Sequence, residues 1–205
     1  MIYSIQMTSY QPLSQQPPIT PTYIGHVIGS SFGLVFVLVN SAPFALGLRI
    51  VACVLAVVVF IVIIAAFIRT TRLTRRRGRA QNETDHAVVG FTGRYWIIIG
   101  VEVIMLFGGL AIVRQVEPAA ALGWIALVVG VHFFPLSRLW APGRAQIVAI
   151  AIAMTVLGIV GLVLAFTTHN ADTVTVVSGV GSGIVLLGTA LIIALQTLTK
   201  RSAML

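Results

Sequence analysis

Residues 51–67 read VACVLAVVVFIVIIAAF, an uninterrupted apolar run without a charged side chain. A helix that crosses the hydrocarbon core of a bilayer, about 30 Å thick, needs about 20 mostly apolar residues, because each residue adds about 1.5 Å. Extended to Arg49 and Ile68, this run is long enough to cross the core. It predicts a transmembrane helix, the most hydrophobic one in the chain.

The composition of the whole chain agrees with this stretch. Of the 205 residues, 58% are hydrophobic and 9% are charged, and the mean hydropathy is +1.03. Soluble domains carry roughly 25% charged residues, so this chain is too poor in charge to cover a water-facing surface. The composition predicts an integral membrane protein and excludes a soluble enzyme, a disordered protein and a nucleic-acid-binding domain.

Six segments are apolar and long enough to be read as transmembrane helices. They are residues 23–40, 49–68, 95–113, 119–136, 145–167 and 173–198. The fold class that follows is an all-α membrane protein, a bundle of six transmembrane helices arranged as three hairpins. The charge-free, proline-rich residues 1–22 predict a disordered polar tail, and residues 199–205 a short basic terminus.

The basic residues predict the orientation of this bundle, because Lys and Arg collect in the cytoplasmic segments of membrane proteins. With the N-terminus in the cytoplasm, 11 of the 13 Lys and Arg residues fall on the inner side, and only Arg49 and Arg114 fall on the outer side. We therefore expect both termini inside, in a multi-pass protein of the cell (cytoplasmic) membrane. The same rule accounts for the net charge of +8 without a nucleic acid partner.

Residues 69–94 form the predicted basic cytoplasmic loop between the second and third spans. Six arginines lie close to its start: Arg69, Arg72, Arg75, Arg76, Arg77 and Arg79. A basic residue at the membrane surface attracts anionic lipid headgroups by about 1 kcal/mol. The cluster is also a determinant of topology, and the two roles are compatible.

Two ionisable residues stand inside predicted spans, where burial of charge is expensive and often functional. Counted along the helix from Tyr95, Glu102 lies about 10 Å below the inner interface. Counted back from Arg138, His132 lies about 9 Å from the same interface. Their spans are joined by a short turn, so we expect Glu102 and His132 at nearly one depth on adjacent antiparallel helices.

This pair has two interpretations of roughly equal weight. It can take up and release a proton near neutral pH, as relays in transporters do. It can also be an inter-helix clamp worth about 0.6 to 2 kcal/mol, which is slightly favoured because no second acid accompanies Glu102. Pro135 removes a backbone donor close to His132 and indicates either a gate or kink beside the pair or the end of the helix.

Other polar and small residues extend this picture. His26, Asn40 and Arg49 are accessory polar candidates, and Arg49 can reach the outer interface through its long side chain. Glycines recur at four-residue spacing in the first span (Gly25, Gly29 and Gly33) and in the sixth (Gly179 and Gly183). Such spacing lets helices approach closely, and packing within the bundle is favoured over a dimer interface.

The chain contains one cysteine, Cys53, and no Cys-x-x-Cys motif. Membrane enzymes usually show clusters of polar or metal-binding residues at an interface, and no such cluster is visible besides the arginines. We therefore expect no metal, no cofactor and no enzymatic activity.

Three motifs, Gly93-Arg94-Tyr95-Trp96, the acidic Glu102 and Gly130-Val131-His132-Phe133-Phe134, together resemble a group of small bacterial multi-span membrane proteins that are described only as uncharacterised. The resemblance covers most of the chain beyond the tail. It implies a bacterial inner-membrane protein and assigns no activity.

Two functional hypotheses follow. The first is a small transporter or permease-like protein in which Glu102 and His132 form a proton-sensitive polar site. The second is a structural or accessory membrane subunit, in which glycine faces bind a second copy or a partner helix and the pair only clamps two helices. Water access distinguishes them, because a transporter needs it at the pair and a clamp does not.

Overall fold

The computed structural model describes residues 20–78, 93–139 and 144–202, and every regular element in these segments is helical. In chain order the elements are α1 (Thr20–Asn40), α2 (Leu46–Gly78), α3 (Gly93–Val116), η1 (Pro118–Ala120), α4 (Ala121–Leu139), α5 (Arg144–Thr168), α6 (Ala171–Val174), η2 (Thr175–Val180) and α7 (Gly181–Ser202). Most of the predicted tail, Arg79 and part of the predicted basic loop lie outside the described residues.

Five helical segments of the described chain are long and apolar enough to cross a membrane. They are Leu46–Arg72, Gly93–Val116, Pro118–Leu139, Arg144–Thr168 and Ala171–Thr199, the last of which runs through α6, η2 and α7. The first helix carries a shorter apolar stretch, Gly25–Asn40. The all-helical fold with several helices of membrane-spanning length and hydrophobicity is therefore confirmed, whereas the six-span count and the orientation stay predictions.

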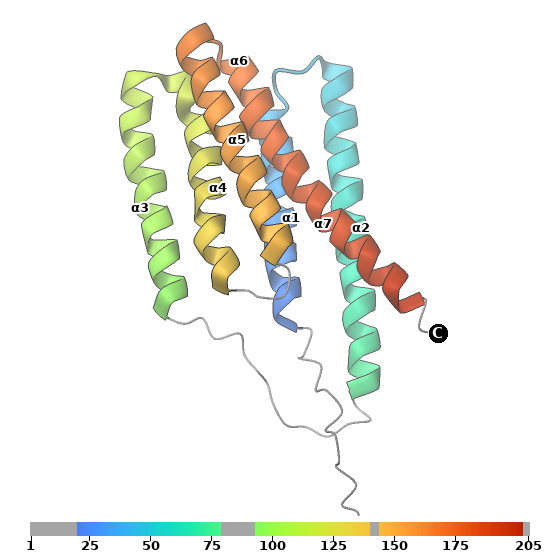
Figure 1. The fold of residues 1–205 in the computed structure, drawn as a ribbon. Helices are drawn as coiled ribbons and strands as arrows, with labels where there is room; N and C mark the ends of the chain where they lie inside the picture. The colour runs from blue at the N-terminus through green and yellow to red at the C-terminus, as the bar shows by residue number, and fades with distance from the viewer. Residues whose placement is uncertain (1–19, 79–92, 140–143, 203–205) are drawn as a thin grey trace, which may run out of the picture.

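The helices run side by side in alternating directions, with α2 and α3 at opposite edges of the bundle (Figure 1). The most extensive packing joins α4 to α5, followed by α1 with α7 and α3 with α4. The second helix packs on α1 and α7. The chain therefore has a central α4–α5–α7 layer, and α3 joins it mainly through α4.

Glycine makes the α4–α5 contact close. A methyl group added to Gly123 would lie 2.7 Å from the backbone nitrogen of Leu162, and one added to Gly130 would collide with Thr155 on α5. On α5, Gly158 faces the backbone of Leu127 in the same way. Without side chains at these points the two backbones approach each other, and this proximity supplies the van der Waals packing that drives helix association in lipid.

The last span contains a π-helical segment, η2, between α6 and α7. Ser178 in this segment donates a hydrogen bond of 2.9 Å from its hydroxyl to the Leu157 carbonyl of α5. Gly179 allows Asn40 of α1 to pack against the segment. π-Segments are rare and widen a helix locally, and here the widened turn is the meeting point of α1, α5 and the last span.

Several element boundaries differ from the sequence-based expectation, among them the start of α1, which includes residues 20–22 of the predicted tail. Residues 69–78, predicted as loop, continue α2 as helix, because Arg, Leu and Thr side chains with a single late glycine do not break it. At 33 residues α2 is about 50 Å long, so its basic end extends beyond a core of about 30 Å. Pro135 lies inside α4, which continues to Leu139, so it does not end the helix.

Candidate functional site

The structure brings the two intramembrane ionisable residues together. The Nδ1 atom of His132 on α4 lies 3.2 Å from Oε1 of Glu102 on α3. The side chains are largely buried, with 13% of His132 and 17% of Glu102 exposed. The depth count along the two spans thus led to a real contact, and the role of that contact stays a prediction.

A second bond determines which ring nitrogen carries hydrogen. His132 Nδ1 also lies 2.8 Å from the carbonyl oxygen of Val129, one turn earlier on α4. A carbonyl oxygen only accepts hydrogen bonds, so Nδ1 is the protonated nitrogen of His132. The Glu102 carboxylate therefore lies beside an N–H whose hydrogen bond goes to Val129, and the proton that the imidazole gains or loses is the one on Nε2.

The pair and a second polar link both join α3 to α4. In the second link, the indole Nε1 of Trp124 donates a hydrogen bond of 3.0 Å to the Met105 carbonyl. The ring of Trp124 lies directly over Gly109, leaving no room there for a methyl group. Glu102 and Gly109 are two turns apart on α3, and their partners are two turns apart on α4, so both links belong to one antiparallel register.

The third helix contributes the exposed side of this site. None of its residues is buried, although it spans Gly93–Val116. Its outward side chains include Ile97, Ile104 and Phe107, which are 67%, 72% and 66% exposed. The site therefore lies at the edge of the bundle, between a lipid-facing helix and the packed α4–α5 layer.

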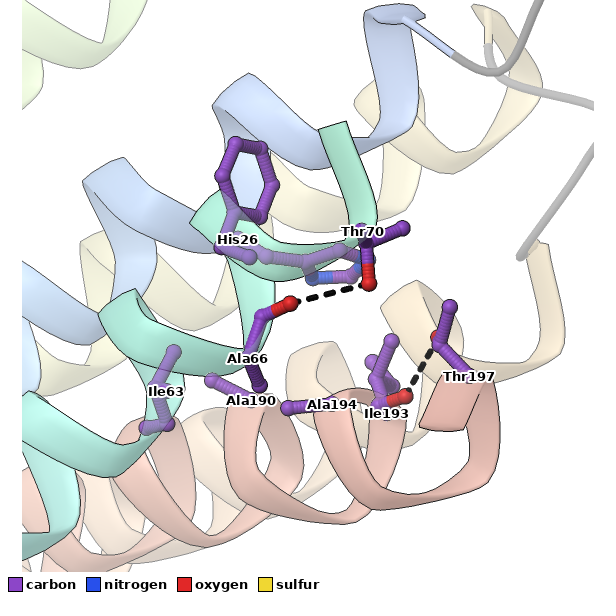
Figure 2. Close-up of a pocket in the computed structure, with 9 residues that line it drawn as sticks. His26, Ile63, Ala66, Thr70, Ala190, Ile193, Ala194 and Thr197 are labelled. Carbon is purple, nitrogen blue, oxygen red and sulfur yellow. Dashed lines mark hydrogen bonds between the residues drawn. The ribbon is translucent and has the colours of Figure 1, made fainter. Parts of the chain in front are cut away.

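The accessory polar candidates lie elsewhere. Asn40 is buried and donates a hydrogen bond of 2.8 Å to the Phe36 carbonyl on its own helix. Arg49 is exposed near the start of α2. His26 lines a small cavity between α1, α2 and α7 (Figure 2). Within the described residues, no hydrogen bond or ion pair joins these side chains to Glu102 or His132.

The predicted glycine faces divide between packed and open positions. Gly33 faces Leu186 and Leu187 of α7, and Gly183 faces Val37 of α1. Gly179 faces Asn40, whereas Gly29 has nothing within 4 Å of an added methyl group, and Gly25 lies near the start of α1. Packing inside the bundle, the favoured interpretation, is thus what the structure shows at Gly33, Gly179 and Gly183.

The arginine cluster lies on the basic end of α2. Arg69 and Arg72 are exposed, and Arg75, Arg76 and Arg77 continue the helix. The first five arginines of the cluster therefore belong to a helix rather than to a loop. Contact with anionic headgroups stays a prediction for all of them.

A second carboxylate–imidazole pair was missed by the sequence reasoning. Oε2 of Glu117, in the α3–α4 turn, accepts a hydrogen bond of 2.5 Å from Nδ1 of His169, in the α5–α6 turn. The bond from His169, and next the bond from the Ala119 backbone N–H, lower the pKa of Glu117 below its ordinary value. The one available signal was that both residues follow the outer ends of predicted spans, which places them on the same side.

The backbone positions both members of this outer pair. Glu117 caps the short helix η1, accepting from Ala119 N at 3.1 Å with Pro118 in the first turn. His169 ends α5 with φ of 51°, in the left-handed region that glycine usually occupies, while its N–H bonds Ala165. These two helix ends therefore bring the side chains together across 52 residues of chain.

Within the described residues, no group of three or more His, Cys, Asp or Glu side chains could hold a metal ion. Cys53 is a free thiol whose sulfur lies 3.3 Å from the Ser41 hydroxyl. Comparisons with protein-family models, curated proteins and solved structures find no match to this chain. The resemblance to uncharacterised bacterial membrane proteins therefore stays a prediction.

Proposed function

We propose that this chain is a six-span protein of the bacterial cytoplasmic membrane with both termini inside, and that it acts as a small proton-sensitive transporter or permease-like protein. The five long apolar helices support the multi-pass part. The apolar Gly25–Asn40 stretch packs against α2 and α7 and supplies the sixth span. The basic end of α2 supports the orientation and a contact with anionic headgroups.

The observation that carries the proposal is the 3.2 Å contact between Glu102 and His132. An imidazolium and a carboxylate attract each other, and this attraction disappears when Glu102 takes up a proton or Nε2 of His132 loses one. Both side chains retain some exposure, so they are not sealed inside the bundle. The charge state of the pair therefore changes how strongly α3 is held to α4.

The position of α3 gives this change a mechanical consequence. Since α3 packs mainly on α4, with no buried residue of its own, few contacts oppose its movement. Release of the pair leaves the Trp124–Met105 bond as the other polar link. We infer that α3 moves relative to α4 as the pair is protonated and released, which is the kind of step that proton-linked transport requires.

Potential-driven proton uptake into proteoliposomes tests this proposal. The full chain is reconstituted with a trapped pH dye, and an inward-negative potassium diffusion potential is applied. We expect uptake by the wild type, loss of uptake in Glu102→Gln and His132→Gln, and wild-type uptake in the control Glu117→Gln. A wild type no faster than protein-free liposomes would contradict a proton-transporting function.

An accessory or structural membrane subunit is the second candidate, favoured by the lipid-facing side of α3. Gly100 and Gly108 lie there with nothing within 4 Å of an added methyl group, which leaves room for another helix to approach. In this function the pair only clamps α3. Disulfide crosslinking of Gly108→Cys in a Cys53→Ser background tests for a second copy, and crosslinked dimers without proton uptake would favour this candidate.

A further inference from the structure

A small cavity lies between α1, α2 and α7 (Figure 2), whereas the Glu102–His132 pair lies between α3 and α4. Its volume is ≈ 20 Å³. A buried water molecule needs at least about 10–15 Å³ of space. The cavity is therefore large enough for a molecule of that size.

One wall of the cavity carries a polar atom that lacks a hydrogen-bond partner. The Nε2 atom of His26 is buried, and no atom of the described residues bonds it. Figure 2 shows this imidazole beside Thr70, facing the helices α2 and α7. Either tautomer of a neutral imidazole needs a partner at Nε2, as a donor to one or as an acceptor from one. Leaving such an atom unbonded in a protein interior costs free energy.

Two threonines supply further oxygen atoms to the walls. Thr70 Oγ1 donates to the Ala66 carbonyl at 2.8 Å, and Thr197 Oγ1 donates to the Ile193 carbonyl at 2.7 Å (Figure 2). Because each hydroxyl has a single hydrogen, these oxygens act as acceptors toward any further group. The polar part of the cavity is thus one imidazole nitrogen with acceptor oxygens around it.

The remaining walls are apolar and explain why the space exists. Ala66 on α2 and Ala190 and Ala194 on α7 face each other where larger residues would fill the gap. Ile63 and Phe67 close the sides. A site with polar groups on one side and hydrocarbon on the others orients a single small molecule and excludes ions that keep a hydration shell.

We propose that this cavity is a binding site for one water-sized molecule that both donates and accepts hydrogen bonds, held by Nε2 of His26. Water and ammonia share this size and this chemistry. Either one can bond Nε2 of His26 in both tautomers, as a donor or as an acceptor. The inference does not rest on the Glu102–His132 pair and is independent of the proposed function.

Magnetic resonance of the full chain in lipid nanodiscs tests occupancy directly. The protein is labelled with ¹⁵N-histidine, and the His26 signals are assigned from the His26→Gln variant. We expect magnetisation transfer between solvent protons and the His26 ring. Addition of ammonium chloride then separates the two sources, because a shift of Nε2 identifies ammonia and an unchanged Nε2 identifies water. Absence of both transfer and shift would overturn the proposal.

Filling the cavity gives a second test with a matched control. Ala194→Val places methyl groups in the cavity, whereas Ala149→Val adds the same groups at an exposed position of α5. We expect Ala194→Val to lower the Tm of the wild type, because it displaces the partner of His26, and to have no such effect in a His26→Leu background. Ala149→Val should leave the Tm unchanged in both backgrounds.

The opposite outcomes are equally clear. A higher Tm for Ala194→Val in the wild type would show that the cavity is dry, because filling an empty apolar space stabilises a protein. An equal loss of Tm in the wild-type and His26→Leu backgrounds would show a steric effect unrelated to His26. Either result would contradict a hydrogen-bonded occupant.

Discussion

Two carboxylate–imidazole pairs lie on the α3–α4 hairpin, one inside the membrane-spanning part and one at its outer turn. In the inner pair, His132 Nδ1 is 3.2 Å from Glu102, and 13% of the histidine side chain is exposed. In the outer pair, His169 Nδ1 is 2.5 Å from Glu117, and 68% of the histidine is exposed. The same two residue types thus form a shorter bond at the exposed turn than within the helices.

The two pairs are held together in different ways. Glu117 accepts from both His169 and the Ala119 backbone, and two helix ends fix its geometry. Glu102 approaches a histidine whose Nδ1 hydrogen bond goes to Val129, so the packing of α3 on α4 is needed to bring the inner pair together. The outer pair therefore depends on local backbone, and the inner pair on helix register.

The largest expected effect comes from separating α3 from α4. Gly109→Val places side-chain atoms inside the Trp124 ring, and overpacking of this kind costs about 1–3 kcal/mol. Gly108→Val is the matched control, because nothing lies within 4 Å of an added methyl group there. We expect a clear loss of Tm in nanodiscs for Gly109→Val and little change for Gly108→Val. Equal losses would show that α3 does not depend on this contact.

A double-mutant cycle on the inner pair should give the next largest effect. We expect Glu102→Gln and His132→Gln to have a coupling energy of about 0.6–1.7 kcal/mol, the range found for polar contacts between membrane helices. The measurement is reversible unfolding of the four proteins in mixed micelles. Additive effects of the two substitutions would mean that the 3.2 Å contact contributes no attraction.

The outer pair should contribute less to global stability, because exposed ion pairs are screened by water. His169→Gly removes the hydrogen bond to Glu117. It also relieves the strain of a non-glycine residue in the left-handed region, so the two effects on stability oppose each other. We expect a smaller Tm change than for His132→Gln, with faster amide hydrogen exchange confined to η1 and the start of α6. A Tm loss larger than that of the inner pair would reverse the comparison.

Acidification should have the smallest effect on stability, and we expect it to act through the Glu117 carboxylate of the outer pair. The hydrogen bond from His169 lowers the pKa of Glu117, so this bond stabilises the fold above the ordinary pKa of a carboxyl group. That contribution is lost as the pH falls through the lowered pKa. Protonation of Glu117, followed by infrared carboxyl absorption, should move to higher pH in His169→Gly. An unchanged midpoint would show that His169 does not hold the carboxylate.

Much of the fold could be predicted because its signals are local. Apolar runs located all the long helices, and counting from Tyr95 and Arg138 placed Glu102 and His132 at one depth. The end of α2 was harder to predict from the sequence, because its arginines mark the membrane surface and not the end of a helix. The end of α4 was missed for a similar reason, since Pro135 is tolerated inside it.

The sequence established a helical protein with segments of membrane-spanning length, since the length and hydrophobicity of each span are properties of consecutive residues. It also placed the inner pair, because a short turn makes α3 and α4 neighbours. Three features could be seen only in the tertiary structure. Gly123 and Gly158 join α4 to α5, and Glu117 contacts His169. In addition, His26 lines a cavity with α2 and α7. These contacts unite residues distant in the chain, and the choice of partner depends on how whole helix surfaces fit together.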